Sequence, residues 1–296
     1  MTEGVTLAAE KIGQIGNFPI TNSLLTTWLV TIILIAFAFI ATRKVSLVPT
    51  PIQNFAEFAI ESLRNMVESV AGEKTKVFFP IIASFFFFIL VGNYLGLLPG
   101  VGTIGFWETP HGETINTEQL TIDSQHLRSP ALDEHPTPPA ATDLQPQSAI
   151  TQTNQQPETS HQKPIFVPLF RSINSDLNTT LALALVSVIT THFFAIKYLG
   201  LGEYLKKWFP LHPIMLFVGL IEVAGEFTKI ISLSFRLFGN IYAGETVLTT
   251  ASSKLFAFIV PIPFLALEII VGFVQALVFA MLTLVFMVIL TTKHEH

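Results

Sequence analysis

Five charged side chains lie within one apolar stretch of the chain, residues 211–250, and this feature limits the folds available to it. They are Glu222, Glu226, Lys229, Arg236 and Glu245, and Arg236 falls near the middle. An ionised side chain at the centre of a bilayer costs about 2.5–3.5 kcal/mol, so such groups usually serve a function. Five of them on one hydrophobic segment exceed what packing requires and indicate a path for an ion.

The composition is that of a membrane protein. Half of the residues are hydrophobic and only 12% are charged, whereas a soluble domain of this length carries more charge on its surface. The net charge of −5 gives no reason to expect a nucleic-acid partner, and the absence of cysteine excludes disulfides and thiol–metal sites. Residues 1–23 lack the apolar core of a cleaved signal, so we expect the first hydrophobic segment to remain as an anchor.

The apolar segments predict an all-α membrane protein with five crossings. A helix of about 20 apolar residues spans the hydrocarbon core, and residues 24–42, 77–98 and 177–197 meet this length. Residues 212–250 and 255–292 would each form a helix of about 55 Å, nearly twice the thickness of about 30 Å. We therefore expect residues 212–292 to form a long, steeply tilted helical hairpin.

Lysine and arginine placement predicts the orientation. Basic residues follow the first and the third predicted spans, and these loops should therefore face the cytoplasm. Five crossings then place residues 1–23 outside and the C-terminus inside. The connection from 99 to 176 carries nine acidic residues and few basic ones, which suits the outer side.

Residues 54–71 predict an amphipathic helix on the cytoplasmic side. One helical stripe is apolar and the remaining positions are mainly polar. The stripe consists of Phe55, Ala59, Leu63, Met66 and Val70. The pattern is typical of a helix that lies on the inner membrane surface. An ordinary soluble hairpin helix is the alternative.

Residues 101–165 predict a disordered outer insertion. No aromatic residue occurs from Glu108 to Lys163, and proline, threonine, glutamine and serine dominate. Such a segment buries too little apolar surface to offset its ordering entropy. Its histidines, at positions 111, 126, 135 and 161, have no metal-ligand spacing, so we expect no metal site there.

Helical geometry distributes the charged groups around Arg236. At 100° per residue, Lys229, Glu222 and Asn240 lie within about 40° of Arg236, while Glu245 points about 180° away. By helical rise, Glu222 and Glu245 lie roughly 21 Å and 14 Å from Arg236, on opposite sides of it. This arrangement indicates two polar inlets that do not meet.

The last predicted helix supplies two further polar groups. Glu268 and Gln275 are seven residues apart and so share one face, which can meet the Arg236 helix. Gln275 can alternatively serve as an interhelical hydrogen-bonding residue of the kind common in membrane bundles.

Structural roles are the alternative for several of these groups. Glu226 and Lys229, three residues apart, can form a surface salt bridge. Glu245 and Glu268 can simply flank the outer headgroup region. His192, in the third span, is better explained as a packed or hydrogen-bonded histidine than as a proton relay. Arg236 fits such a role least, because apolar residues extend well beyond it in both directions.

Two motifs resemble one known family. Residues 232–245, SLSFRLFGNIYAGE, closely resemble the signature of subunit a of rotary F-type ATP synthases. Residues 175–183, SDLNTTLAL, resemble the start of an earlier span in that family, and Gln275 lies on a similar final long helix. The resemblance covers residues 165–292 and, more loosely, the first two spans, whereas the 101–165 insertion departs from the family pattern.

The resemblance implies a proton-channel subunit of the membrane (Fo) sector. Its long hairpin would curve around a ring of c subunits, and Arg236 would match the arginine that favours the ionised ring carboxylate and blocks a direct path between two half-channels. The residues matching the outer half-channel are Asp176, Asn240, Glu245, Glu268 and Gln275, and Glu222 matches the inner one. The implied partners are the c-ring, the peripheral-stalk subunit b, the lipid bilayer and protons.

The same resemblance implies no cofactor and no ATP chemistry on this chain, and no glycine-rich phosphate loop occurs in the sequence. We expect the bacterial inner membrane as its location. A secondary ion transporter and a non-conducting membrane scaffold are the alternatives. The first should show internal repeats, which we do not find, and the second gives no reason to retain Arg236.

Overall fold

The computed structural model describes residues 9–43, 51–98, 101, 104–108, 165–208, 213–254 and 261–292. The chain divides into two compact units, residues 1–106 with 167–296 and residues 107–166, and everything argued below lies in the first. Most of the predicted disordered insertion at 101–165 lies outside the described residues. Two short strands are described at the ends of this insertion, β3 (Gly105–Glu108) and β4 (Ile165–Pro168).

A short hairpin precedes the first helix. Strands β1 (Lys11–Ile15) and β2 (Phe18–Thr21) pair antiparallel, with Ile15 opposite Phe18. The turn between them places Gly16 at a φ of 62°, a conformation that glycine adopts without steric cost. Helix α1 (Asn22–Thr42) follows directly, and the Thr21 hydroxyl accepts a hydrogen bond from the Leu24 amide as its N-cap.

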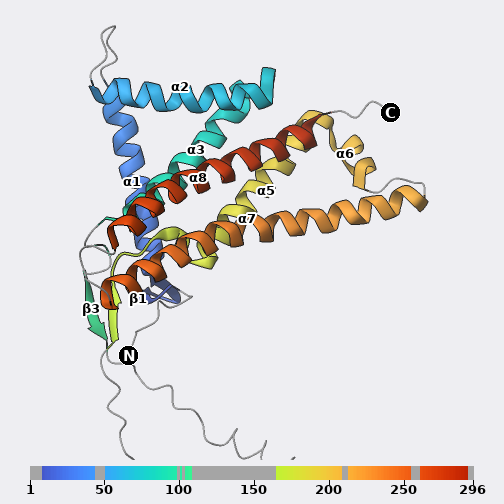
Figure 1. The fold of residues 1–296 in the computed structure, drawn as a ribbon. Helices are drawn as coiled ribbons and strands as arrows, with labels where there is room; N and C mark the ends of the chain where they lie inside the picture. Colours follow the sequence, from blue (N-terminus) through green and yellow to red (C-terminus); the bar gives the residue numbers. More distant parts are fainter. Residues whose placement is uncertain are drawn as a thin grey trace, which may run out of the picture. The chain divides into compact units, whose positions relative to one another are not determined.

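Helix α2 (Pro51–Ala71) contains the predicted amphipathic segment and runs crosswise to α1 in Figure 1. The predicted apolar stripe lies mostly outside the contact of α2 with the rest of the protein. Of its five members only Leu63 is buried, and the other protein-facing positions are Gln53, Ala56, Val67 and Ala71. The apolar side of the helix is wider than its contact with the rest of the protein. One edge of that side therefore packs on the protein, while Phe55 and Met66 remain exposed.

Between α2 and the long helices, the chain also forms the helices α3 and α5 and three short helical elements. A 3₁₀ turn, η1 (Gly72–Lys74), leads into α3 (Thr75–Gly96). A second 3₁₀ turn, η2 (Ile173–Ser175), precedes α5 (Leu177–Leu199). Gly200, with a φ of 81°, follows the last residue of α5 as its C-cap. The short helix α6 (Leu201–Trp208) completes the connection.

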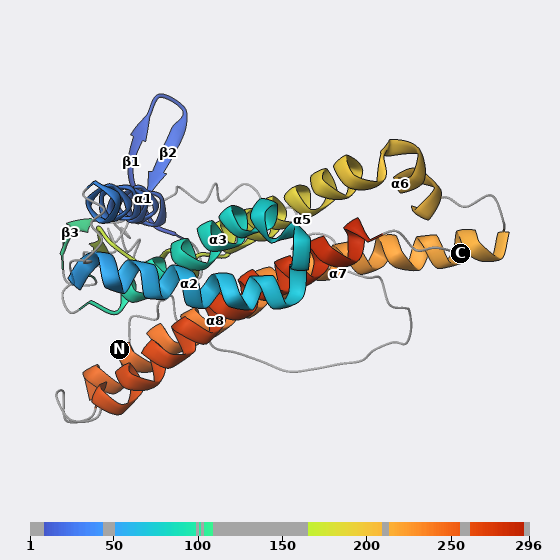
Figure 2. The same cartoon turned by 90° about the horizontal axis from the view of Figure 1, so that it is seen from above.

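Two long helices complete the unit. Helix α7 (Pro213–Lys254) has 42 residues and α8 (Pro261–Thr291) has 31. Figures 1 and 2 show them running side by side along most of α8. They are antiparallel, because Lys229 lies over the ring of Phe286 while Asn240, further along α7, bonds to Gln275, earlier on α8. This is the packing expected of the predicted hairpin, although residues 255–260 lie outside the description.

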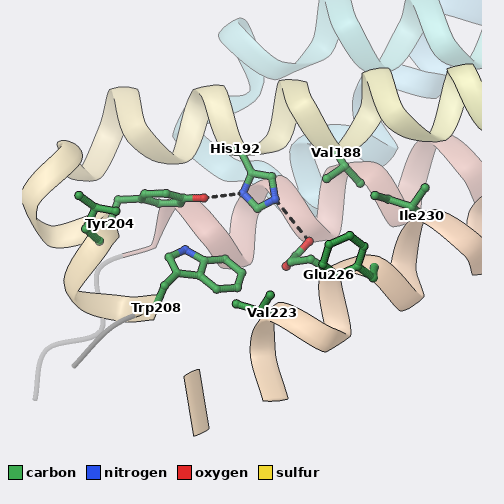
Figure 3. A pocket seen from close by; sticks show the side chains of 9 residues that line it. Val188, His192, Tyr204, Trp208, Val223, Glu226 and Ile230 are labelled. Carbon is green, nitrogen blue, oxygen red and sulfur yellow. Dashed lines mark hydrogen bonds and ion pairs between the residues drawn. The ribbon is translucent and has the colours of Figure 1, made fainter. Parts of the chain in front are cut away.

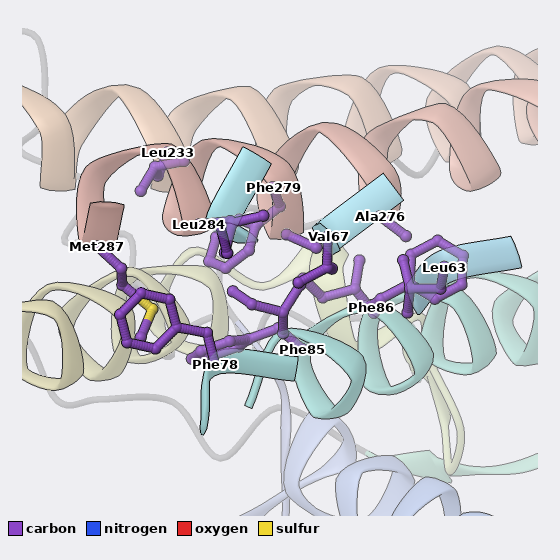
Figure 4. Close-up of a cluster of buried hydrophobic side chains, with 14 of the residues drawn as sticks. Leu63, Val67, Phe78, Phe85, Phe86, Leu233, Ala276, Phe279, Leu284 and Met287 are labelled. Atoms are coloured by element: carbon purple, nitrogen blue, oxygen red, sulfur yellow. The ribbon is translucent and has the colours of Figure 1, made fainter. Parts of the chain in front are cut away.

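The hydrophobic core gathers where α2, α3, α5, α7 and α8 meet (Figure 4). Buried positions on α8 recur every three or four residues from Glu268 to Thr291, so one stripe of that helix faces the protein. Aromatic rings join the helices: Phe85 and Phe279 have centroids 5.7 Å apart, and Phe78 and Phe194 lie 5.5 Å apart.

The unit is mostly helical, with four helical regions of the described chain long and apolar enough to cross a membrane. These are Asn22–Thr42, Leu177–Leu199, Pro261–Thr291 and a segment within Pro51–Gly96. Helix α7 is not among the four, and six of its 42 residues are charged. The all-α membrane class is consistent with this result, and five crossings remain a prediction.

Candidate functional site

Two residue pairs, each with at least one polar side chain, connect α7 and α8. The side-chain amide of Asn240 donates to Oε1 of Gln275 over 2.9 Å. One turn further along α7, Gly244 faces the carboxyl group of buried Glu268, and its missing side chain leaves the space that this carboxyl occupies. The prediction that Glu268 and Gln275 share a face that meets the Arg236 helix is confirmed.

A cavity of about 180 Å³ lies beside these pairs. Glu245 and Glu268 both line it, together with Asn93 of α3 and Arg171 from the segment before η2. Arg171 is buried, and its Nε lies 3.5 Å from Oε2 of Glu245. The cavity therefore contains two carboxyl groups and one guanidinium, and its volume is well above the roughly 10–15 Å³ that one water requires.

The start of α1 holds the segment that carries Arg171 and Asp176. The backbone amide of Arg171 donates to Oγ1 of Thr26 over 3.3 Å. Asp176 is buried and caps α5 by accepting from the Asn178 amide over 3.2 Å. It also accepts from the Ser23 hydroxyl over 2.9 Å. Asp176 thus has a fixed structural role beside the cavity, and it does not line it.

A chain of amides connects this segment to α8. The side-chain amide of Asn174 donates to Oδ1 of Asn93 over 2.6 Å, and Asn93 donates to the backbone carbonyl of Gly272 over 3.1 Å. All three positions lie at the buried junction of η2, α3 and α8. Buried amides that are hydrogen-bonded across elements in this way fix the relative positions of the elements that carry them.

Arg236 lies outside the buried core. Leu233 and Leu237 are buried, whereas Arg236 is exposed, and so are Phe235 and Ile231 on a neighbouring side of the helix. Its Nη2 donates to the Ser232 hydroxyl over 3.4 Å, and it forms no ion pair within the described ranges. Glu222 is exposed too, whereas Lys229, the third ionisable group predicted to share this face, is half-buried and paired with Glu226.

A second polar cluster lies towards the other end of α7 (Figure 3). Nζ of Lys229 donates to Glu226 over 2.6 Å, and Nε2 of His192 lies 3.6 Å from the same carboxyl group. His192 Nδ1 shares a hydrogen bond of 2.9 Å with the Tyr204 hydroxyl. Burial, and then the nearby Glu226 carboxylate, raise the pKa of Tyr204, which keeps its hydroxyl protonated.

This cluster lines a cavity of about 350 Å³ and connects α5, α6 and α7. The predicted salt bridge between Glu226 and Lys229 is confirmed, and so is the interpretation of His192 as a hydrogen-bonded histidine. The contribution of Tyr204 was not predicted, because its partner His192 lies on another helix, twelve residues earlier.

Sequence reasoning missed Arg171, Asn93 and Asn174. Arg171 was counted only as one of the basic residues of the outer connection, whereas it is buried against Glu245. Its position five residues before Asp176, between Phe170 and the apolar Ile173, was the available signal. Asn93 stands alone in an apolar run, which by itself is a weak indication of a buried amide.

Comparison with known proteins decides the family. The chain matches the family described as ATP synthase A chain over residues 24–288. The chain belongs to this family. It is 31% identical to ATP synthase subunit a of Geobacter sulfurreducens, over 88% of this chain and 83% of that protein. It is also 30% identical to ATP synthase subunit a of Gloeobacter violaceus, over 94% of this chain and 89% of that protein.

Membership of the ATP synthase A chain family gives the site its general context. The family is that of the membrane subunit of ATP synthase, which is not itself catalytic, and it connects the chain with ATP synthesis and proton transport. The apolar helices of the described chain agree with a membrane protein.

Proposed function

We propose that this chain forms two offset proton half-channels that load and unload the carboxyl groups of a rotating c-ring, with Arg236 between them. The observation that carries the proposal is the exposure of Arg236, in the middle of α7, outside the buried core. An ionised guanidinium at membrane depth needs an anionic partner. Arg236 forms no ion pair within the part of the chain that the structure describes, and in this proposal a ring carboxyl group supplies the partner.

Arg236 acts in this scheme by its fixed charge. A guanidinium is always protonated, and a carboxyl group that passes it is favoured in its ionised form. Each ring carboxyl therefore releases its proton before it passes Arg236 and takes up another afterwards. The same positive charge repels a proton that would cross directly between the half-channels, so flow requires rotation.

The outer half-channel runs through the cavity between α3, α7 and α8. Glu245 and Glu268 line it, and the Asn240–Gln275 pair lies between it and the level of Arg236. Asp176 contributes by capping α5 and holding the segment that closes one wall. These groups offer a continuous series of proton-accepting and hydrogen-bonding side chains on one side of Arg236.

Glu222 forms the inner half-channel. It is exposed on the Arg236 face, roughly 21 Å away by helical rise and on the other side from Glu245. Each proton that traverses the scheme supplies about 2.3 kcal/mol per 100 mV of membrane potential. The N-terminus lies outside, the C-terminus is cytoplasmic, and the location is a bacterial inner membrane, with subunit b as a further partner.

The predicted segments fit the same scheme. Residues 24–42, 77–98 and 177–197 cross the bilayer, residues 54–71 lie on its cytoplasmic side, and the 212–292 hairpin carries the proton path. A secondary transporter has less support, because the polar groups lie on two sides of Arg236 instead of converging on one midplane site.

ATP-driven acidification of inverted vesicles tests the proposal. The wild-type chain and Arg236→Ala are compared in a strain without its own copy of the subunit, with assembly of the complex checked for each. We expect pumping only with wild type, and we expect Arg236→Lys to fail as well, since a compact ammonium lacks the planar fork. Equal pumping by wild type and Arg236→Ala would make Arg236 structural and overturn the proposal.

A further inference from the structure

Arg171 gives the two carboxyl groups of the outer cavity different surroundings. Its guanidinium lies 3.5 Å from Glu245, and the side chain is only 4% exposed. Its backbone amide is held by Thr26, whose own hydroxyl donates to the Asn22 carbonyl over 2.9 Å. The backbone that carries this cation is therefore held at the start of α1.

Glu268 faces a different environment. It lies on α8 beneath Gly244, is buried, and forms no ion pair within the parts of the chain that the structure describes. Around it, α7 presents Glu245, α3 presents Asn93 and then Tyr94, whose hydroxyl donates to the Ile269 carbonyl over 3.3 Å. Arg171 is the cation that lines the cavity with these groups.

The charge balance follows from these neighbours. With both carboxyl groups ionised, the cavity carries two negative charges and one positive charge, so one proton makes it neutral. An opposite charge within about 4–6 Å favours the ionised form of a carboxyl group, whereas a like charge favours the neutral form. Glu245 has the opposite charge beside it, and Glu268 faces the like charge of Glu245.

We infer that Arg171 is a positioning residue whose guanidinium compensates the charge of Glu245 and thereby leaves Glu268 as the group that carries the transported proton. The inference rests on the proposed function, and it names a residue outside the motif that carries the family resemblance. Glu245 then supplies a fixed negative charge that attracts protons into the cavity. Glu268 takes up and releases them one at a time.

The charge balance can be altered one group at a time. Arg171→Gln leaves two carboxyl groups facing each other without a cation, and they should hold their shared proton to higher pH. The double variant Arg171→Gln/Glu245→Gln again surrounds Glu268 with no net charge. Arg171→Lys keeps the charge and serves as the matched control. Glu245→Gln alone leaves the cation beside Glu268 and should shift proton release to lower pH.

The test uses the complete ATP synthase in inverted vesicles with equal pH on both sides. The initial rate of ATP-driven pumping, per assembled complex, is followed against pH. We expect the pH of half-maximal pumping to rise by about 1–3 units in Arg171→Gln. It should change little in Arg171→Lys and return towards the wild-type value in the double variant. A packing role for Arg171 gives no such return.

Infrared titration of the purified complex covers variants that assemble but pump too slowly. The C=O band of the protonated carboxyl group is assigned by its loss in Glu268→Gln, and its titration should move in the same directions. An unchanged titration in Arg171→Gln, or a shift that the double variant does not reverse, overturns the inference. If Arg171→Gln does not assemble, a titration of Glu245→Gln that stays at the wild-type pH overturns it.

Failure of the proposed function has a different signature. Wild-type pumping at every pH by both Glu245→Gln and Glu268→Gln would remove this cavity from the proton path, whatever the infrared titration shows. A loss of pumping in these variants together with an unmoved Arg171→Gln profile would reject only the role of Arg171.

Discussion

A methyl group added at Gly244 should displace Glu268 and slow proton transport. A Cβ built on Gly244 overlaps the carboxyl carbon and both carboxyl oxygens of Glu268. These atoms are the far end of a flexible side chain, so α7 and α8 can stay packed while the carboxyl group turns away. Returning the carboxyl group to its transport position against this methyl group should cost about 1–3 kcal/mol, the usual cost of overpacking. At 1.36 kcal/mol for each factor of ten in rate, we expect pumping to fall roughly 5- to 150-fold.

The assay for Gly244→Ala is ATP-driven acidification of inverted vesicles, normalised to assembled complex. Gly202→Ala is the matched control, because Gly202 is also helical and a Cβ there meets no atom within 4 Å. Combining Gly244→Ala with Glu268→Asp removes one methylene from the displaced side chain and should recover part of the rate. Wild-type pumping by assembled Gly244→Ala would show that the position of the Glu268 carboxyl does not matter, and would refute the reasoning.

Three further substitutions separate structural from transport roles. Gly96→Ala places a methyl group 2.6 Å from Cβ and 3.1 Å from the backbone Cα of Ser172. Thermal melting of the purified complex should show a loss of about 1–3 kcal/mol of stability, in contrast to Gly244→Ala, where a flexible side chain can move away. Asp176→Ala should destabilise the complex by about 0.5–2 kcal/mol through loss of the α5 cap, and Asp176→Asn should keep most of that stability; equal melting of the two variants would contradict the capping role. Lys74→Met removes the hydrogen bond of 2.9 Å to the Thr291 carbonyl at the end of α8. Protease cleavage of that end should increase by a factor that corresponds to about 1.5–3 kcal/mol, and an unchanged rate would exclude this contact as an anchor.

Local sequence patterns determined much of this protein. Apolar segments of helical length predicted the main helices, because a chain in lipid must satisfy its backbone hydrogen bonds internally. Helical periodicity placed Arg236 and Glu245 on opposite sides of α7, and Glu268 and Gln275 on the side of α8 that meets it. Such relations depend only on spacing along one helix, so no tertiary information was needed.

Which edge of α2 packs on the protein could not be derived in the same way. Its apolar arc covers more of the helix than the protein contacts, and hydropathy does not separate a position that packs on α3 or α8 from one that faces outwards. Leu63 and Val67 are buried, whereas Phe55 is 65% exposed, although all three are apolar. The packing of neighbouring helices decided which edge is buried.

The chemistry of the cavity also depended on tertiary contacts. The pairing of Arg171 with Glu245 joins residues 74 positions apart, and the approach of Gly244 to Glu268 depends on how α7 and α8 are aligned. Both contacts are set by side-chain packing between elements that are separate in the sequence. The sequence by itself determined which groups face each side of a helix. Only the tertiary structure decided which carboxyl group has a cation beside it, because charge interactions depend on distance in space and not on distance along the chain.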